Sequence, residues 1–211
     1  MTFAQVDTAP RAAGDPAARS SDTLRFMPAA DSDETLMIAY RDGDAGAFAE
    51  LYARHRGGLY RFILRQCGAR ALADELFQDV WMNLIAARAR YQPTAKFATF
   101  LYQVARNRIV DHYRARGRSL EEPQPGDDGD DPPSAASTAP DRQLESRQAA
   151  GRLLGLVEAL PAAQREAFVL HQESGLSLED IAQLTGTTRE TVKSRLRYAL
   201  AKLREGMEGW L

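Results

Sequence analysis

Apolar residues recur at helical spacing in two short blocks near the end of the chain, and a turn signal separates the blocks. The first block begins at Ser177 and stops at Gly186, a residue type that leaves a helix with positive φ at little steric cost. Ser177 with Asp180, and Thr187 with Glu190, fit the S/T-x-x-acid pattern that caps the first turn of a helix. The second block carries an apolar stripe formed by Val192, Leu196, Ala199, Leu200 and Leu203. The pattern therefore predicts a helix-turn-helix.

The rest of the periodic sequence is also helical. Asp44 is placed to cap a helix that runs towards Phe62, and Gly68 punctuates the chain before the next helix. Pro93 lacks the amide that a helix interior needs, so residues 91–96 are expected to form a loop. Further helices are expected at about 72–88, 97–116, 141–160 and 161–175. Since no alternating strand pattern is present, the sequence predicts an all-α fold.

Two segments lack this periodicity and divide the chain. Residues 1–31 are rich in Ala, Pro, Ser and Asp and are expected to form a disordered tail. Residues 119–143 are rich in Pro, Gly and acidic side chains, so we expect a flexible acidic linker. The prediction is therefore two small helical domains on a tether, at 32–118 and 144–211, with the helix-turn-helix in the second.

Composition excludes several classes of function. No run approaches the roughly 20 apolar residues of a membrane span, and the first residues show no secretory signal, so we expect a cytoplasmic protein without membrane insertion. The single cysteine, Cys67, excludes a disulfide framework, and the three histidines lack zinc-site spacing. The carboxylates Asp111 and Glu166 have no partner base or nucleophile. We therefore expect no cofactor, no metal and no enzymatic activity.

Charge is segregated along the chain, although the formal net charge is only −2. Residues 186–204 carry six Lys or Arg against one acid, and residues 96–118 carry six against one, whereas residues 119–141 hold seven acids and no base. Arg189, Lys193 and Arg197 recur every four positions and so share one face of the second helix of the helix-turn-helix. A cationic face on that helix suits the major groove of DNA. A solvated basic face on a small helical hairpin is the plainer alternative.

Three sequence blocks, in this order, resemble the sigma factors of bacterial RNA polymerase, in the extracytoplasmic-function subfamily of the sigma-70 family. Residues 73–81, ADELFQDVW, are similar to the segment that grips the polymerase. Residues 97–114, FATFLYQVARNRIVDHYR, resemble the part of domain 2 that reads the promoter −10 element. Residues 160–170, LPAAQREAFVL, with the helix-turn-helix after them, resemble domain 4. Phe100 departs from the pattern, because many members have Trp there.

The resemblance assigns roles to three groups of residues. The −35 element would be read from the second helix of the helix-turn-helix, by Thr188, Arg189, Glu190, Thr191, Lys193, Ser194 and Arg197. The −10 element would be contacted by Lys96, Arg106, Asn107, Arg108 and Arg114, since cations track phosphates and Asn can read a base edge. Core polymerase would be bound by Asp74, Glu75, Gln78, Asp79 and Trp81, an acidic surface with an aromatic anchor.

The implied function is promoter-specific transcription initiation with core RNA polymerase, through its β′ clamp coiled coil and β flap, and with promoter DNA. Whether an anti-sigma factor also binds the chain is left open by the sequence. One alternative is a stand-alone helix-turn-helix regulator that uses residues 32–117 for dimerisation or ligand binding. Another is an adaptor that binds a second regulator without touching DNA. The basic blocks argue against both.

Overall fold

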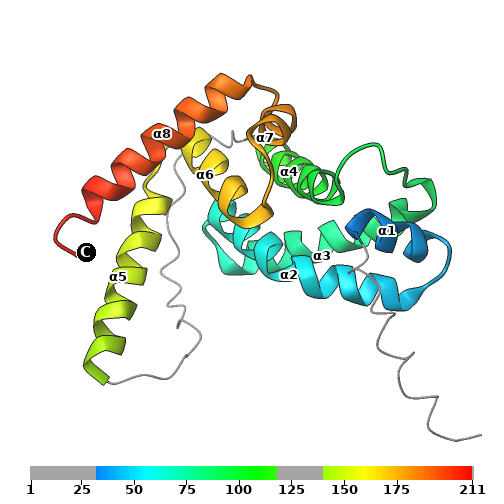
Figure 1. The fold of residues 1–211 in the computed structure, drawn as a ribbon, viewed down its shortest axis with the longest axis horizontal. Helices are drawn as coiled ribbons and strands as arrows, with labels where there is room; N and C mark the ends of the chain where they lie inside the picture. Colours follow the sequence, from blue (N-terminus) through cyan, green and yellow to red (C-terminus); the bar gives the residue numbers. More distant parts are fainter. Residues whose placement is uncertain (1–31, 118–139, 211) are drawn as a thin grey trace, which may run out of the picture. The chain divides into compact units, whose positions relative to one another are not determined.

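The computed structural model describes residues 32–117 and 140–210, and every regular element within these ranges is a helix (Figure 1). The first range holds α1 (Asp33–Arg41), α2 (Ala45–Cys67), α3 (Arg70–Ala87), the short 3-10 helix η2 (Arg88–Arg90) and α4 (Phe97–Ala115). The second holds α5 (Pro140–Glu158), α6 (Ala162–Ser174), α7 (Leu178–Thr185) and α8 (Arg189–Gly206). The all-α prediction is confirmed.

Two predicted segments fall mainly outside these ranges. The tail at residues 1–31 and most of the linker at residues 119–143 lie outside the part of the chain that the structure describes. α5 begins at Pro140, close to the expected start of helix at about residue 141, and its first residues fall within the range given to the linker.

Local signals fix the ends of the helices in the first domain. The Asp44 carboxylate accepts hydrogen bonds from the amides of Gly46 and Ala47 and so caps α2, as expected. Gly68 ends the same helix with φ of 70°. The pair Gly57–Gly58 does not interrupt α2, which runs without a break because flanking side chains such as Leu59 and Phe62 are fully buried.

The core of the first domain is built from one apolar stripe on each helix. Met37, Leu51, Leu76 and Leu101 are fully buried, as is Phe97 at the start of α4. An aromatic cluster adds to this core, and its members are Tyr40, Phe48, Tyr52, Phe77 and Trp81. Tyr40 and Trp81 are buried and the other three rings are half-buried, and removing such large rings from water contributes to the stability of the domain.

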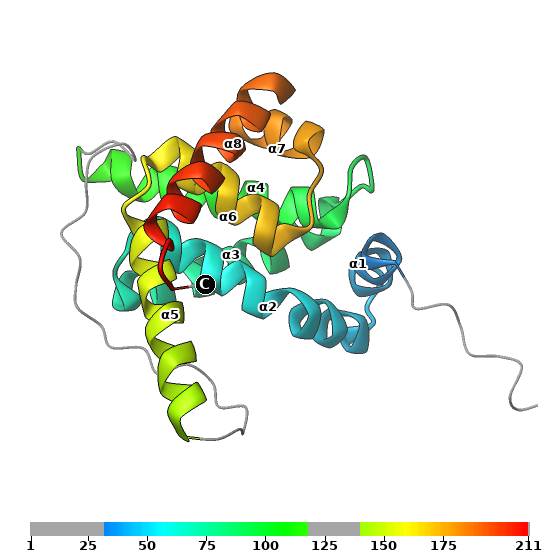
Figure 2. The same cartoon turned by 60° about the vertical axis from the view of Figure 1, so that its left-hand side comes forward.

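The helix-turn-helix forms as predicted, with one shift of register. Ser177 and Asp180 make a complete capping box at the start of α7, and Gly186 ends that helix with φ of 68°. The cap of α8 is Thr188, whose hydroxyl accepts from the amide of Thr191, so the predicted Thr187–Glu190 box is wrong by one residue. α7 contacts α8, beside the first turns of α8 in both views (Figures 1 and 2).

The predicted stripe on α8 is only partly buried. Val192, Ala199 and Leu203 lie in the core, and Leu196 is half-buried. Leu200 is 46% exposed, so its assignment to the core is corrected. A helical stripe wider than the surface available to cover it leaves its outermost member in solvent.

Candidate nucleic-acid interface

The N-terminal half of α8 presents an exposed cationic surface. Arg189, Lys193 and Arg197 are all exposed, and they follow the capped end of the helix. Thr188 and Glu190 are also exposed, whereas Thr191 and Ser194 are half-buried. Free amides and the positive end of the helix dipole add to the cations there, so this end of α8 suits the negative surface of DNA.

The three cations differ in how far their charge is compensated. Arg189 forms ion pairs with Glu179 of α7 and, at 3.1 Å, with its neighbour Glu190. No carboxylate within the described ranges pairs with Lys193 or Arg197, and Arg197 instead stacks over the ring of Tyr198. Lys193 and Arg197 are therefore the stronger candidates for a phosphate or a base edge.

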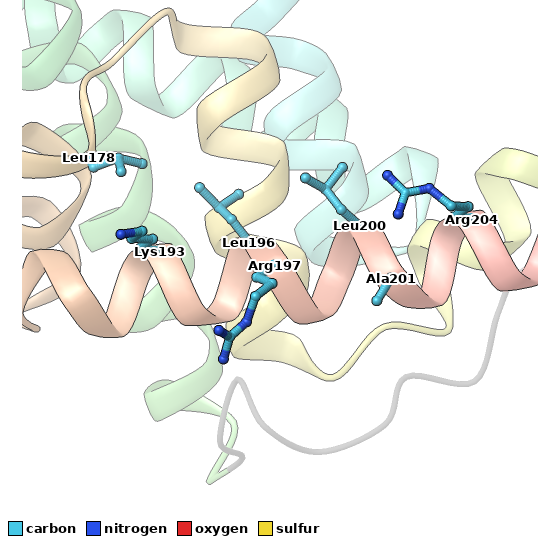
Figure 3. Close-up of a pocket in the computed structure, with 7 residues that line it drawn as sticks. All are labelled: Leu178, Lys193, Leu196, Arg197, Leu200, Ala201 and Arg204. Carbon is cyan, nitrogen blue, oxygen red and sulfur yellow. The ribbon is translucent and has the colours of Figure 1, made fainter.

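A shallow groove of about 360 Å³ runs along α8 beside these cations (Figure 3). Leu178, Leu196 and Leu200 supply its apolar lining, and Lys193 and Arg204 extend from the same helix. Figure 3 shows the side chain of Arg197 directed away from Leu196 and Leu200. Leu200, which the sequence pattern placed in the core, lines this groove.

The cations predicted for the −10 element lie at and along α4, and most of them are paired. Lys96 is exposed and binds Asp180 at 3.0 Å, and Arg106 binds Glu166 at 2.9 Å. Arg108 is half-buried and binds Asp79 of α3. Arg114 is exposed. Neighbouring carboxylates therefore hold three of these four cations in fixed positions.

Asn107 differs from these cations because it is neutral and exposed. Its side-chain oxygen accepts a hydrogen bond from the amide of Gln103, one turn earlier on α4. No hydrogen-bond partner for its own NH₂ group is found among the described residues. An exposed Asn amide can both donate to and accept from a base edge.

The group predicted to bind polymerase lies on α3, with one correction. Asp74, Glu75 and Gln78 are exposed, and the Tyr60 hydroxyl donates to Asp74 at 2.8 Å. Trp81 is only 5% exposed and packs in the aromatic cluster, so it is not the surface anchor that the sequence suggested. The apolar side chain exposed at this place is Met82, which is 63% exposed and which sequence reasoning missed.

Two further residues near the expected DNA surface were also missed. Glu34 and Arg41 of α1 contact the ends of the loop at residues 91–96. The Phe97 backbone amide donates to Glu34 and holds the pKa of that carboxyl below its ordinary value of 4.5. These contacts span 63 and 50 residues, so no local pattern signals them.

Other chemistry finds little support in the described residues. Within residues 32–117 and 140–210, no cluster of His, Cys, Asp and Glu has the arrangement of a metal site. Burial raises the pKa of the Cys67 thiol to about 12, which leaves it protonated and unreactive at neutral pH. None of the helices in these two described ranges combines the length with the apolar character that a membrane span needs.

The chain matches two family models and resembles known proteins over most of its length. Residues 51–119 match sigma-70 region 2, and residues 150–203 match sigma-70 region 4. RNA polymerase sigma factor CarQ of Myxococcus xanthus is 32% identical over 169 residues, which cover 80% of this chain and 94% of CarQ. ECF RNA polymerase sigma factor RpoE of Cereibacter sphaeroides is 32% identical over 174 residues, covering 82% and 93%.

Solved structures share the fold. The sigma factor RpoE of Bartonella quintana, solved with the anti-sigma factor NepR, has a TM-score of 0.57 at 26% identity. The aligned region covers 77% of this chain and 97% of the RpoE chain. CnrH, solved with the cytosolic domain of CnrY, has a TM-score of 0.60 at 23% identity, covering 84% and 98%. The second likeness concerns the fold alone.

Proposed function

This chain belongs to the extracytoplasmic-function sigma factors of the sigma-70 family and acts with core RNA polymerase and promoter DNA, and on that premise we propose which of its surfaces perform each task. The first helical domain binds polymerase and the −10 element, and the second reads the −35 element. The role is regulatory rather than enzymatic, and it is performed in the cytoplasm, where polymerase and the chromosome are located.

The observation that carries the −35 assignment is the pair of uncompensated cations on α8. Lys193 and Arg197 project from the exposed face of the second helix of a helix-turn-helix, and no carboxylate in the described ranges neutralises them. Thr188, Arg189, Glu190, Thr191 and Ser194 complete the reading surface. A helix that enters the major groove contacts base edges mainly with its N-terminal residues.

We assign binding of the −10 element to the exposed end of the loop at residues 91–96 and to the exposed face of α4. Asn107 and Arg114 are exposed and contact DNA directly, whereas Lys96, although exposed, does so after leaving Asp180. Arg106 and Arg108 are held by Glu166 and Asp79, so they reach DNA only when those pairs exchange. Cations supply affinity for the backbone, and Asn107 supplies selectivity.

The exposed acidic face of α3 is assigned to binding of core polymerase, at its β′ clamp coiled coil. Asp74, Glu75 and Gln78 form this face, and Met82 replaces Trp81 as its apolar contact. An exposed methionine adapts to the shape of a partner, while the carboxylates set the orientation of docking. The β flap, and an anti-sigma factor of the kind solved with RpoE of Bartonella quintana, are further partners in this proposal.

Binding of promoter DNA with and without core polymerase separates this function from its main alternative. We expect the free protein to bind a promoter fragment weakly and with little sequence preference, and to gain tight, specific binding when core polymerase is added. A stand-alone helix-turn-helix regulator would bind its operator specifically by itself and would not change on addition of polymerase. That outcome would overturn the proposal.

A further inference from the structure

The loop before α4 is exposed along its length and anchored at both ends. Residues 92–96 are all exposed, whereas Tyr91 before them and Phe97 after them are almost fully buried. Within the loop, the Thr94 amide donates to the carbonyl of Gln92 at 2.8 Å, which makes a local turn. Besides this turn and the pairing of Lys96 with Asp180, contacts at the two ends of the loop help to fix its shape.

The end of the loop is held by Glu34, which lies 63 residues away in the chain. Lys96 is the N-cap of α4 and its side chain makes no capping bond, so the first amides of the helix lack the usual partner. The Glu34 carboxylate takes that place and accepts from the Phe97 amide at 2.7 Å. A carboxylate at a helix N-terminus also interacts favourably with the helix dipole.

The beginning of the loop is held by Arg41, at the other end of α1. Its Nη1 donates to the Tyr91 carbonyl at 3.4 Å, a long but partly buried contact. The ring of Tyr91 packs edge-on against Phe100, with 5.5 Å between centroids. One nine-residue helix thus contacts both ends of the exposed loop.

α1 is itself fixed to the domain, so it can act as a support. Asp33 binds Arg54 at 2.9 Å and His55 at 2.7 Å, and both of those residues belong to α2. Leu36 and Met37 of α1 are buried in the core. The carboxylate of Glu34 is therefore carried on a rigid element.

We propose that Glu34, assisted by Arg41, is a positioning residue that holds the loop at residues 92–96 in the shape that receives the −10 strand. This inference rests on the proposed role of the loop and of Lys96 in −10 binding. A loop already ordered before binding loses less conformational entropy when the strand docks, so the support raises affinity without touching DNA. The ligand that this loop receives is single-stranded promoter DNA.

The test compares Glu34→Ala and Glu34→Gln in the complete holoenzyme. Binding of each free variant to core polymerase is measured first, and the assembled holoenzyme is then measured on two DNA targets, a duplex with only a −35 element and a probe with an unpaired −10 strand. For Glu34→Ala we expect about tenfold weaker binding of the −10 probe, in line with the loss of a helix cap, and unchanged binding of the other two. Glu34→Gln keeps an acceptor oxygen and should recover part of the loss.

Two further variants and one direct measurement make the outcomes distinct. Glu208→Ala removes the same charge from an exposed residue after α8 that contacts neither α1 nor the loop, and it should bind the −10 probe like the parent. Hydrogen exchange of the Phe97 amide in the free protein should accelerate in Glu34→Ala. Lys96→Ala tests the loop's role in DNA binding separately.

The results separate the positioning role from the proposed function. If Lys96→Ala weakens −10 binding while Glu34→Ala does not, the positioning role is wrong and the function of the loop stands. If neither variant weakens −10 binding, the loop has been assigned wrongly and both claims fail. Equal losses of Glu34→Ala for all three targets would indicate general destabilisation and would also contradict the positioning role.

Discussion

The guanidinium of Arg108 on α4 contacts the carboxylate of Asp79 on α3, with 2.6 Å between Nη2 and Oδ2. The Nε of the same arginine donates to that oxygen at 2.8 Å. Sequence reasoning placed Arg108 on the DNA surface and Asp79 on the polymerase surface. Because the two side chains bind each other across two helices, a change at either residue alters both surfaces.

The first prediction follows from that pair. Charge reversal by Asp79→Lys would place a cation beside Arg108, so we expect the free energy of unfolding to fall by up to about 1 kcal/mol through loss of the partly exposed ion pair, and further through the new repulsion. Glu75→Lys is the matched variant on the exposed face of α3 and should leave unfolding unchanged while weakening core polymerase binding. Urea unfolding and co-purification with core polymerase measure the two effects. Normal polymerase binding by Glu75→Lys would contradict the assignment of this face.

A second prediction concerns the cations of α8. Lys193→Ala and Arg197→Ala should each lower the affinity of the holoenzyme for a −35 duplex, and each should reduce the salt dependence by about one unit of slope if it removes a phosphate contact. Arg189→Ala should have a smaller effect, because Glu179 and Glu190 already neutralise Arg189. Lys202→Ala is the control, since nine positions after Lys193 it lies on the opposite side of the helix. Losses no greater than that of Lys202→Ala would mean that another face reads the DNA.

The third prediction tests the corrected start of α8. Thr188→Ala removes the hydroxyl that accepts from the Thr191 amide and should cost about 1 kcal/mol of stability, measured by unfolding of the free protein. Thr187→Ala should cost less, because the Thr187 hydroxyl contacts Thr185 and caps no helix. If Thr187→Ala cost more stability than Thr188→Ala, Thr187 would be the cap of α8, as the sequence pattern predicted.

The fourth prediction is a pH dependence at Glu34. The Phe97 amide lowers the pKa of this carboxyl below 4.5 in the folded protein, so its stabilisation is present above pH 4.5 and is lost as the pH falls through the lowered value. The free energy of unfolding of Glu34→Gln should therefore fall less than that of the parent as the pH decreases below 4.5. Parallel curves for the two proteins would show that the contact adds no pH-linked stability.

Local signals predicted most of the fold. The residues that begin or end a helix act within one turn of it, as Asp44, Gly68, Ser177 and Gly186 do. A short stretch of sequence therefore includes both partners of each interaction. The cap of α8 was misplaced because consecutive residues, Thr187 and Thr188, both offer a hydroxyl, and only the backbone conformation selects one.

The candidate site was predicted less completely, because its geometry depends on distant contacts. Periodicity gives the faces of a helix but not which neighbour covers them, so Trp81 was expected at the surface and Leu200 in the core. Two contacts join different helices, the ion pair of Arg108 with Asp79 and the hydrogen bond from Phe97 to Glu34. Local residue spacing does not indicate such contacts.

Run-off transcription with purified core polymerase tests the central claim most directly. The template carries a promoter selected by the parent holoenzyme, and the parent is compared with a Lys193→Ala, Arg197→Ala double variant and with Lys202→Ala. We expect a defined transcript with the parent and with Lys202→Ala, and loss of that transcript with the double variant although it still binds core polymerase. No promoter-dependent transcript from the parent, or full transcription by the double variant, would contradict the account.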